Sequence, residues 1–254
     1  MQQITLNANK CFDWNLPLTE KVSDVMRAFG ITVQRLKENA ITHNCSIKLA
    51  PGQIAYITGP SGSGKSVLLR EFYNNFGQTH RSAPTTITKI NIDSIALPDD
   101  KTCVDCFEEV ASNGSGGEAR FGYEKRKTAN ETNIAAKTEN TSFLDILRTL
   151  SYAGLTDVFC VLNSPANLSE GQKYRYKIAK AIASEKQFIF ADEFCSNLDR
   201  VTAAVISHNI RKLATKTGKT FILASSHDDL LADLLPEVIV IKHLAGEAEV
   251  IYKN

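Results

Sequence analysis

The chain has 254 residues, 43% hydrophobic and 22% charged, as expected for a soluble globular protein of one large or two small domains. Lysine and arginine total 29 against 28 for aspartate and glutamate, so no global charge draws the chain to nucleic acid or to an anionic membrane. Neither a secretory signal nor a membrane-spanning run is visible, and the six scattered cysteines suit reduced thiols, so we expect a cytoplasmic protein.

The first strong pattern is a strand, a glycine-rich loop and a helix between residues 53 and 76. QIAYITG is an apolar run that ends in glycine, GPSGSGKS follows, and SVLLREFYNNF reads as a helix. The loop fits the phosphate-binding pattern GxxxxGK[ST] and stands where such a loop belongs. Its residues are Gly59, Pro60, Ser61, Gly62, Ser63, Gly64, Lys65 and Ser66. We expect Lys65 to neutralise β- and γ-phosphate charge and the Ser66 hydroxyl to ligate Mg²⁺.

The middle of the chain differs in composition. Cys103 and Cys106 have metal-like spacing, but no second pair or histidines complete four ligands, so two ordinary cysteines are the simpler interpretation. Residues 111–140 are polar and are interpreted as a mobile insertion. After it, Phe143, Ile146, Leu147 and Leu150 fall on one face of a helix, which predicts an inserted helical subdomain over 98–180.

A second strand–helix–strand pattern follows the helical region. QFIFAD at 187–192 and TFILASSH at 220–227 are apolar runs, and the segment 201–218 between them has helical spacing. The alternation predicts an α/β fold with a mostly parallel sheet, to which two C-terminal strands around a glycine turn would be added.

Acidic residues end the first of these strands. Asp192 and Glu193 follow four buried positions, which is costly unless a cation lies there. We expect Asp192 to hold Mg²⁺ through water and Glu193 to orient or deprotonate the attacking water. His227 ends the next strand, where it could contact the γ-phosphate as a neutral donor.

Five motifs in this order resemble those of ABC-type ATPases: GPSGSGKS, LSEGQ at 168–172, FIFADE at 188–193, SNLD at 196–199, and His227. The resemblance implies a P-loop NTPase fold with an N-terminal antiparallel β-subdomain and an inserted α-helical subdomain. It divides a single domain, 1–254, into 1–97, 98–180 and 181–254. It also implies a head-to-tail homodimer that binds ATP and Mg²⁺ and switches conformation on hydrolysis.

The resemblance assigns further nucleotide contacts. Ser169, Gly171 and Gln172 belong to the signature that would face the γ-phosphate of a second copy, and Asp199 belongs to the loop between the copies. Phe29 falls where the family places an adenine-stacking aromatic, although a core position is the alternative. More narrowly, LSEGQKYRYKIAKAIA and DEFCSNLDRVTA are similar to soluble ABC ATPases fused to a GNAT-type acetyltransferase domain.

Two departures bear on the partner. No glutamine occurs in KINIDSIALPDDK, where the family usually has one that relays partner contacts, and Asp93 stands near its place. Glu170 replaces a common glycine of the signature. The alternatives that stay open are the nucleotide-binding subunit of a transporter and a nucleic-acid-associated ATPase. The latter rests on the basic and aromatic stretch 173–177 and on the basic stretch 124–127.

Overall fold

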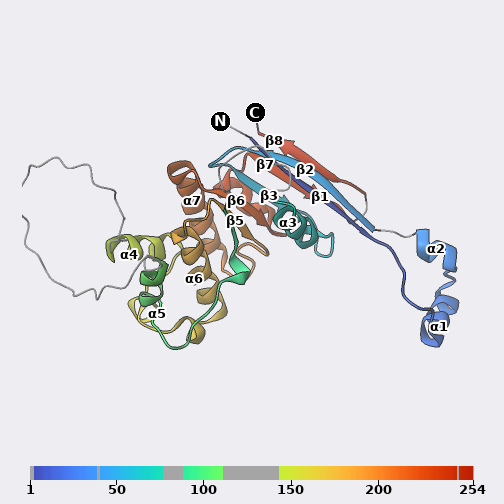
Figure 1. Ribbon diagram of the computed structural model, residues 1–254, viewed down its shortest axis with the longest axis horizontal. Coiled ribbons are helices and arrows are strands. Elements are labelled where there is room, and N and C mark those ends of the chain that lie inside the picture. The colour runs from blue at the N-terminus through green and yellow to red at the C-terminus, as the bar shows by residue number, and fades with distance from the viewer. Residues whose placement is uncertain (1–2, 39–40, 77–87, 111–142, 245, 254) are drawn as a thin grey trace, which may run out of the picture. The chain divides into compact units, whose positions relative to one another are not determined.

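A computed structural model describes residues 3–38, 41–76, 88–110, 143–244 and 246–253 of the chain (Figure 1). The chain forms two compact units. The first consists of Met1–Ile95 together with Glu185–Asn254, and the second is Ala96–Ser184. The second unit takes in the predicted helical range 98–180, and the predicted insertion 111–140 lies outside the described residues.

The first unit is built on a six-stranded sheet. Five neighbouring strands are parallel, and β8 pairs antiparallel with β7 at one edge. The strands in spatial order are β4 (Lys89–Asn91), β5 (Phe188–Ala191), β6 (Thr220–Ala224), β3 (Ile54–Thr58), β7 (Val238–Lys242) and β8 (Ala248–Tyr252). Every residue of β3, β5 and β6 is buried, as continuous apolar runs in a parallel sheet should be. The predicted α/β class is confirmed.

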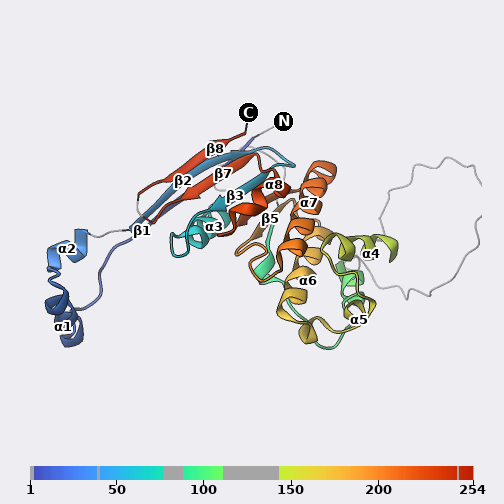
Figure 2. The ribbon, with the colours of Figure 1, turned by 180° about the vertical axis from the view of Figure 1, so that it is seen from behind.

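A second sheet of two antiparallel strands covers part of this core. β1 (Ile4–Phe12) pairs with β2 (Ile41–Leu49), with Ile4 opposite Leu49 and Phe12 opposite Ile41. The inward-facing residues of both strands join one hydrophobic cluster with the main sheet and with the helix α3 (Lys65–Asn74). β2 also runs alongside β8 (Figure 2). The predicted N-terminal antiparallel part is therefore present.

Two short helices, which were not predicted from the sequence, connect β1 to β2. They are α1 (Glu20–Phe29) and α2 (Val33–Glu38). Thr19 begins α1 by accepting a hydrogen bond from the Val22 N–H at 3.3 Å, and Gly30 ends it in the left-handed conformation. Neither helix contains a buried residue. In α1 the apolar residues Val22, Val25, Met26 and Phe29 recur at helical spacing, so this helix was readable from the sequence and was overlooked.

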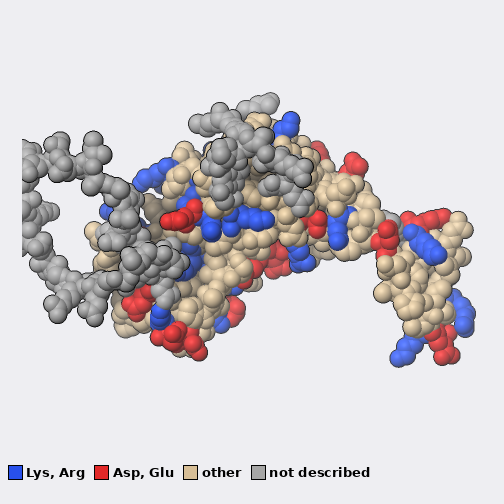
Figure 3. All heavy atoms as spheres, viewed as in Figure 1, with Lys and Arg blue, Asp and Glu red and all other residues tan. Residues whose placement is uncertain are grey.

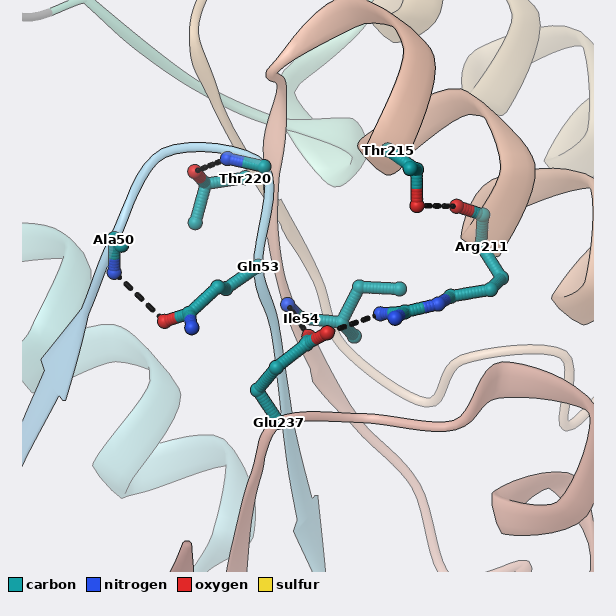
Figure 4. Close-up of polar contacts among 8 residues, drawn as sticks. Ala50, Gln53, Ile54, Arg211, Thr215, Thr220 and Glu237 are labelled. Carbon is teal, nitrogen blue, oxygen red and sulfur yellow. Dashed lines mark hydrogen bonds and ion pairs between the residues drawn. The ribbon is translucent and has the colours of Figure 1, made fainter. Parts of the chain in front are cut away.

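The remaining helices of the first unit are α7 (Arg200–Thr217) and α8 (Leu231–Leu234). Glu237 joins α7 to the amino end of β3: its carboxylate accepts from the Ile54 N–H at 2.8 Å and forms an ion pair with Arg211 (Figure 4). This contact lies at the amino end of β3, at Ile54. The glycine-rich loop begins at the other end of the same strand, after Thr58.

The second unit is helical. The elements in its described residues are η2 (Asp105–Val110), α4 (Phe143–Tyr152), α5 (Val158–Val161), η3 (Pro165–Asn167) and α6 (Glu170–Ala183). Of the predicted stripe on α4, Ile146 and Leu150 are buried and Leu147 is half-buried, but Phe143 is 56% exposed at the first turn. α4 packs on α6 through this stripe, so the helix was predicted correctly and its apolar face is shorter than expected.

Candidate functional site

The glycine-rich loop joins the carboxyl end of β3 to α3 in a conformation that glycine alone tolerates. Gly59 has φ of 139°, and a Cβ there would come 2.1 Å from the Lys242 carbonyl oxygen. Gly64 has φ of 98° at the N-cap of α3. The Lys65 ammonium bridges the loop by donating to the carbonyl oxygens of Gly59 at 2.8 Å and Pro60 at 2.9 Å. The backbone N–H groups that open α3 are of the kind that can receive an anion.

Three carboxylates act electrostatically on the Lys65 ammonium. β5 lies beside β6 and β6 beside β3, all parallel, so their carboxyl ends share one edge of the sheet. Burial lowers the pKa of the Lys65 ammonium, and the negative charges of Asp192, Glu193 and Asp228 oppose that shift. The sheet edge therefore brings together the predicted phosphate-binding lysine and both predicted acidic residues.

The two acidic residues differ in their surroundings. Asp192 is half-buried, and its Oδ1 accepts from the Glu193 N–H at 2.9 Å. Glu193 is exposed with φ of 43°, an unusual value for a residue with a side chain, and its Oε2 lies 3.4 Å from the Ser196 hydroxyl. The Phe194 N–H donates to the Ala224 carbonyl at 2.7 Å, which ties this loop to β6. The strained turn leaves the Glu193 side chain accessible to solvent.

His227 follows β6 on the same edge. Its backbone is held on both sides: the Tyr56 hydroxyl donates to its carbonyl oxygen at 2.6 Å, and its N–H donates to the Ser225 hydroxyl at 3.3 Å. Burial raises the pKa of Tyr56 to about 12, so this hydroxyl stays a donor at neutral pH. The next residue, Asp228, accepts a hydrogen bond from Thr58 at the end of β3. The half-buried His227 imidazole is thus carried on a fixed backbone.

Asp199 and Asp93 lie in two loops of the first unit. Asp199 caps α7, with Oδ1 accepting from the Thr202 N–H at 2.9 Å, and hydrogen bonds from Thr202 lower the pKa of its carboxyl. Asp93 lies in the turn η1 (Ile92–Ser94) directly after β4, the parallel neighbour of β5. Asp93 is exposed at the sheet edge that also carries Asp192, which agrees with its expected place in the loop that lacks glutamine.

Two further residues at the glycine-rich loop were not found from the sequence. His43 on β2 is 5% exposed, and a Cβ at Gly64 would come 2.1 Å from its Cε1. The Phe12 ring at the end of β1 meets the His43 ring edge-on, with centroids 5.8 Å apart. Burial, and then the charge of Lys242, lower the pKa of His43. Strand alternation in β2, which places His43 on the face of Ile47 and Leu49, is the one signal that could have found it.

Phe29, the predicted adenine-stacking residue, is the last residue of α1 and is 75% exposed. This exposure excludes the alternative that Phe29 is a core residue. An adenine contact by Phe29 stays a prediction. The Phe12 ring is 47% exposed and, unlike Phe29, reaches the glycine-rich loop through a described contact, the one with His43.

The signature residues lie in the second unit and open α6. Ser169 is the N-cap: its hydroxyl accepts from the Gln172 N–H at 3.4 Å, while the Gln172 side chain accepts from the Ser169 N–H at 2.9 Å. This reciprocal pair is a capping box. Glu170 is exposed and pairs with Lys173 at 2.9 Å, which lowers the pKa of its carboxyl. Gly171 is half-buried in the first turn. The helix start survives the replacement of glycine by Glu170.

Two other patterns from the sequence have structural roles. In the basic and aromatic stretch, Tyr176 is fully buried and Arg175 donates to the carbonyls of Gly154 and Gly171, so neither is free to stack on a base. Cys103 and Cys106 are buried thiols, and burial raises the pKa of Cys103 to about 12. Within the described residues no group of three or more His, Cys, Asp or Glu side chains could hold a metal ion. The stretch 124–127 lies outside the described residues.

The charge of the visible surface and the helix lengths add two general observations. Acidic and basic side chains are interspersed over the face shown in Figure 3, in keeping with a net charge of +1. None of the helices in the described part of the chain is both long and apolar enough to cross a membrane.

Comparisons with known proteins point to one family. Residues 42–196 match the ABC transporter family. The methionine import ATP-binding protein MetN of Brucella abortus is 29% identical over 236 residues, which cover 89% of this chain and 58% of that protein. MetN of Sodalis glossinidius is 30% identical over 224 residues, covering 87% of this chain and 62% of that protein. The chain thus spans about 60% of the length of these relatives.

Solved structures share the fold at low sequence identity. A bacterial ABC transporter cassette, solved as a dimer, has 19% identity and a TM-score of 0.63, with 98% of both chains covered. An inward-facing putative metal-chelate type ABC transporter has 18% identity and a TM-score of 0.58, with 99% of this chain and 84% of that chain covered. At these identities the likeness establishes the fold.

Proposed function

Because the chain belongs to the ABC transporter family, we propose that it binds ATP with Mg²⁺ and hydrolyses it to ADP and phosphate. A second copy of the chain would complete the site. The observation that carries the proposal is the arrangement around Lys65. Its ammonium lies in the glycine-rich loop and within the field of Asp192 and Glu193 at the carboxyl edge of the sheet. A phosphate-binding cation and two carboxylates at one edge are what phosphoryl transfer requires.

Binding would exchange one set of Lys65 partners for another. The ammonium now donates to the carbonyl oxygens of Gly59 and Pro60, which hold it within the loop. Phosphate oxygens carry more negative charge than carbonyl oxygens. The β- and γ-phosphates would therefore replace the two carbonyls as acceptors of the Lys65 ammonium hydrogens. The backbone N–H groups of the loop and of the first turn of α3 would then surround the phosphates.

The donor set at the loop suits Mg²⁺. Ser66 offers a hydroxyl at the start of α3 and Asp192 a carboxylate at the end of β5, both hard oxygen donors. Mg²⁺ usually takes one or two protein ligands, with phosphate oxygens and waters in the remaining positions. When bound, the ion would neutralise phosphate charge. Ser66 would contact it directly and Asp192 through water.

Glu193 and His227 would act on the water and on the γ-phosphate. The Glu193 carboxylate is exposed and lies next to the residue that would hold Mg²⁺, so it can orient or deprotonate a water there. His227 would donate a hydrogen bond to the γ-phosphate from its fixed backbone position. The Glu193 role needs a side chain that reaches solvent in the empty site, and Glu193 is exposed.

The second copy would supply the signature. Ser169 and the N–H groups at Glu170 and Gly171 begin α6, and the first N–H groups of a helix have no partner within the helix. They would face the γ-phosphate held by the other copy's glycine-rich loop, with Asp199 in the loop between the copies. Hydrolysis would reopen the pair, and this opening and closing would drive a change in a partner protein.

The adenine base needs an aromatic platform. We place Phe12 in this role alongside the predicted Phe29, because the Phe12 ring contacts His43 and His43 contacts Gly64. A half-exposed ring linked in this way to the phosphate site can stack on a base without a large rearrangement.

The partner can belong to one of two classes. The relatives named as methionine import proteins favour a second candidate function, the nucleotide-binding subunit of an importer. The turn after β4, with Asp93 and no glutamine, favours a partner other than a membrane permease, such as an acetyltransferase, as the narrower sequence resemblance implies. Co-purification with a membrane protein or with an acetyltransferase separates the two. A nucleic-acid partner has little support, since Tyr176 and Arg175 are used within the second unit.

Glu193→Gln tests the proposal. The variant keeps the size of the side chain and removes the base, so ATP turnover should cease while an ATP-dependent dimer accumulates, as measured by light scattering. Glu185→Gln is the matched control: it makes the same change at the opposite end of β5 and should turn over normally. A Glu193→Gln protein that stays monomeric in ATP, or that hydrolyses it at the original rate, contradicts the proposal.

A further inference from the structure

A chain of hydrogen bonds reaches the signature from α5. The Gln172 side chain donates from Nε2 to Cys160 Sγ at 2.9 Å, and its Oε1 accepts from the Ser169 N–H at 2.9 Å. The Cys160 thiol in turn donates to Asp157 Oδ2 at 3.5 Å. Asp157 caps α5 through its other oxygen, which accepts from the Phe159 N–H at 2.9 Å. Four residues thus connect the start of α5 to the start of α6.

The donors and acceptors of this chain agree in direction. The thiol has one hydrogen, which it gives to the Asp157 carboxylate, and its sulfur accepts from the Gln172 amide. The amide oxygen of Gln172 is left to accept from Ser169. Because Cys160 accepts only from the NH₂ end of the amide, it fixes which end faces Ser169. Flipping the amide would place its NH₂ against a second donor, the Ser169 N–H.

Burial makes Cys160 a fixed support for this amide. Its side chain is 8% exposed, whereas Ser169 at the other end of the chain is exposed. Desolvation and the hydrogen bond to Asp157 raise the pKa of the thiol, so it keeps the hydrogen that it donates. A buried side chain has already lost its rotamer freedom on folding, so the thiol loses little further entropy when it holds its neighbour.

We propose that Cys160 is a positioning residue for the signature: through the Gln172 amide it holds the Ser169 backbone so that the start of α6 can meet the γ-phosphate of a second copy. This inference rests on the proposed function. It also gives Gln172 a different role from the predicted nucleotide contact, since both ends of its amide are engaged by the chain itself. In this proposal neither Gln172 nor Cys160 needs to contact the reacting phosphate.

The test uses three substitutions in the full chain. Cys160→Ala removes the acceptor, Cys160→Ser restores a group that can accept and donate, and Gln172→Glu keeps an oxygen for Ser169 but loses the donor to Cys160. ATP turnover and the ATP-dependent dimer in a Glu193→Gln background are measured for each. Binding of a fluorescent ATP analogue to the monomer, and the unfolding temperature, are measured in parallel.

Cys160→Ala and Gln172→Glu should each lower turnover about fivefold to tenfold, as the loss of one positioned hydrogen bond does. Dimerisation should weaken to the same extent. ATP binding by the monomer should not change, because the glycine-rich loop lies in the other unit. Cys160→Ser should recover most of the loss. The double variant should be no slower than either single variant, since both remove the same bond.

The two kinds of failure are separable. If the unchanged chain does not hydrolyse ATP, or if the Glu193→Gln chain does not dimerise in ATP, the proposed function fails. If both results are as expected, the inference is overturned by normal turnover in Cys160→Ala, by additive losses in the double variant, or by a loss that Cys160→Ser does not recover. Should Cys160→Ala fail to fold, Gln172→Glu and Cys160→Ser still decide, because a slow Gln172→Glu and a near-normal Cys160→Ser are both required.

Discussion

The imidazole of His43 lies against the backbone of Gly64. A Cβ added to Gly64 would come 2.1 Å from Cε1 and 2.6 Å from Nδ1 of His43. His43 belongs to the two-stranded sheet and Gly64 to the glycine-rich loop of the main sheet, so one buried ring links the two. The shape of the loop therefore depends on a side chain that no sequence motif marks.

Gly64→Ala should weaken ATP binding strongly. The added methyl group would collide with a ring that is packed on all sides, and φ of 98° is strained for alanine. Strain of about 1–3 kcal/mol corresponds to a loss of roughly 5- to 150-fold in affinity. Binding of a fluorescent ATP analogue measures the loss, and thermal unfolding shows whether the chain stays folded.

Gly62→Ala is the matched control for that substitution. Gly62 lies in the same loop with φ of 78°, but a Cβ there meets nothing within 4 Å. Gly62→Ala should therefore lose less affinity than Gly64→Ala. Equal losses in the two variants would show that the backbone conformation alone, and not His43, dictates glycine at position 64.

The stability of the chain should fall in mild acid because of His43. Burial and the charge of Lys242 lower the pKa of His43 in the folded chain below its unfolded value of about 6.5. The unfolded chain then binds more protons than the folded chain. The contribution of His43 to the free energy of unfolding is therefore complete above pH 6.5 and is lost as the pH falls through the folded pKa. The Lys242 side chain, on β7, is the charge that opposes an imidazolium at His43.

His43→Phe should flatten this dependence. Unfolding temperatures of the two proteins between pH 5 and pH 8 provide the comparison. His208→Phe, which changes an exposed histidine on α7, serves as the control and should leave the profile as it is in the unchanged chain. Profiles of His43→Phe and the unchanged chain that run parallel throughout would contradict the assignment.

Phe12→Ala should weaken ATP binding and leave inorganic triphosphate binding unchanged. The Phe12 ring reaches the glycine-rich loop through His43, so its loss would remove a platform for the base but no phosphate contact. An aromatic–base stack is worth about 1–3 kcal/mol, which corresponds to roughly 5- to 150-fold in affinity. Phe29→Ala is the paired test, and a selective loss of ATP binding in that variant alone would assign the base to Phe29 instead.

The parts of the fold that were predicted depend on local patterns. The buried strands 54–58, 188–191 and 220–224 are continuous apolar runs in the sequence. The glycine-rich loop was recognised from the spacing of its glycines and its lysine, which the conformation of the loop itself requires. The carboxyl ends of parallel strands share an edge, so Asp192 and His227 could be assigned to one site before their positions were known.

The parts that were missed depend on contacts between distant segments. Phe12 and His43 meet because β1 and β2 pair, although α1 and α2 separate them along the chain. No spacing rule connects a phenylalanine to a histidine across two helices. Similarly, the Ser-x-x-Gln spacing of residues 169–172 is a readable capping box, but the hydrogen bond of Gln172 to Cys160 joins two helices, and no local spacing predicts it.

Ser169→Arg should separate ATP binding from ATP turnover. Ser169 lies at the exposed start of α6, in the unit that does not contain the glycine-rich loop, so monomer affinity for ATP should stay unchanged. A long cationic side chain there would replace the hydroxyl cap and obstruct the approach of a second copy, so dimerisation and hydrolysis should be lost.

Asn167→Arg adds the same charge two residues earlier, on η3, and should keep most of the activity because the cap stays intact. Light scattering in ATP and phosphate release distinguish the variants. Full turnover by Ser169→Arg would mean that α6 does not take part in the site, because no hydrolysing pair could form around so large a side chain at its N-cap.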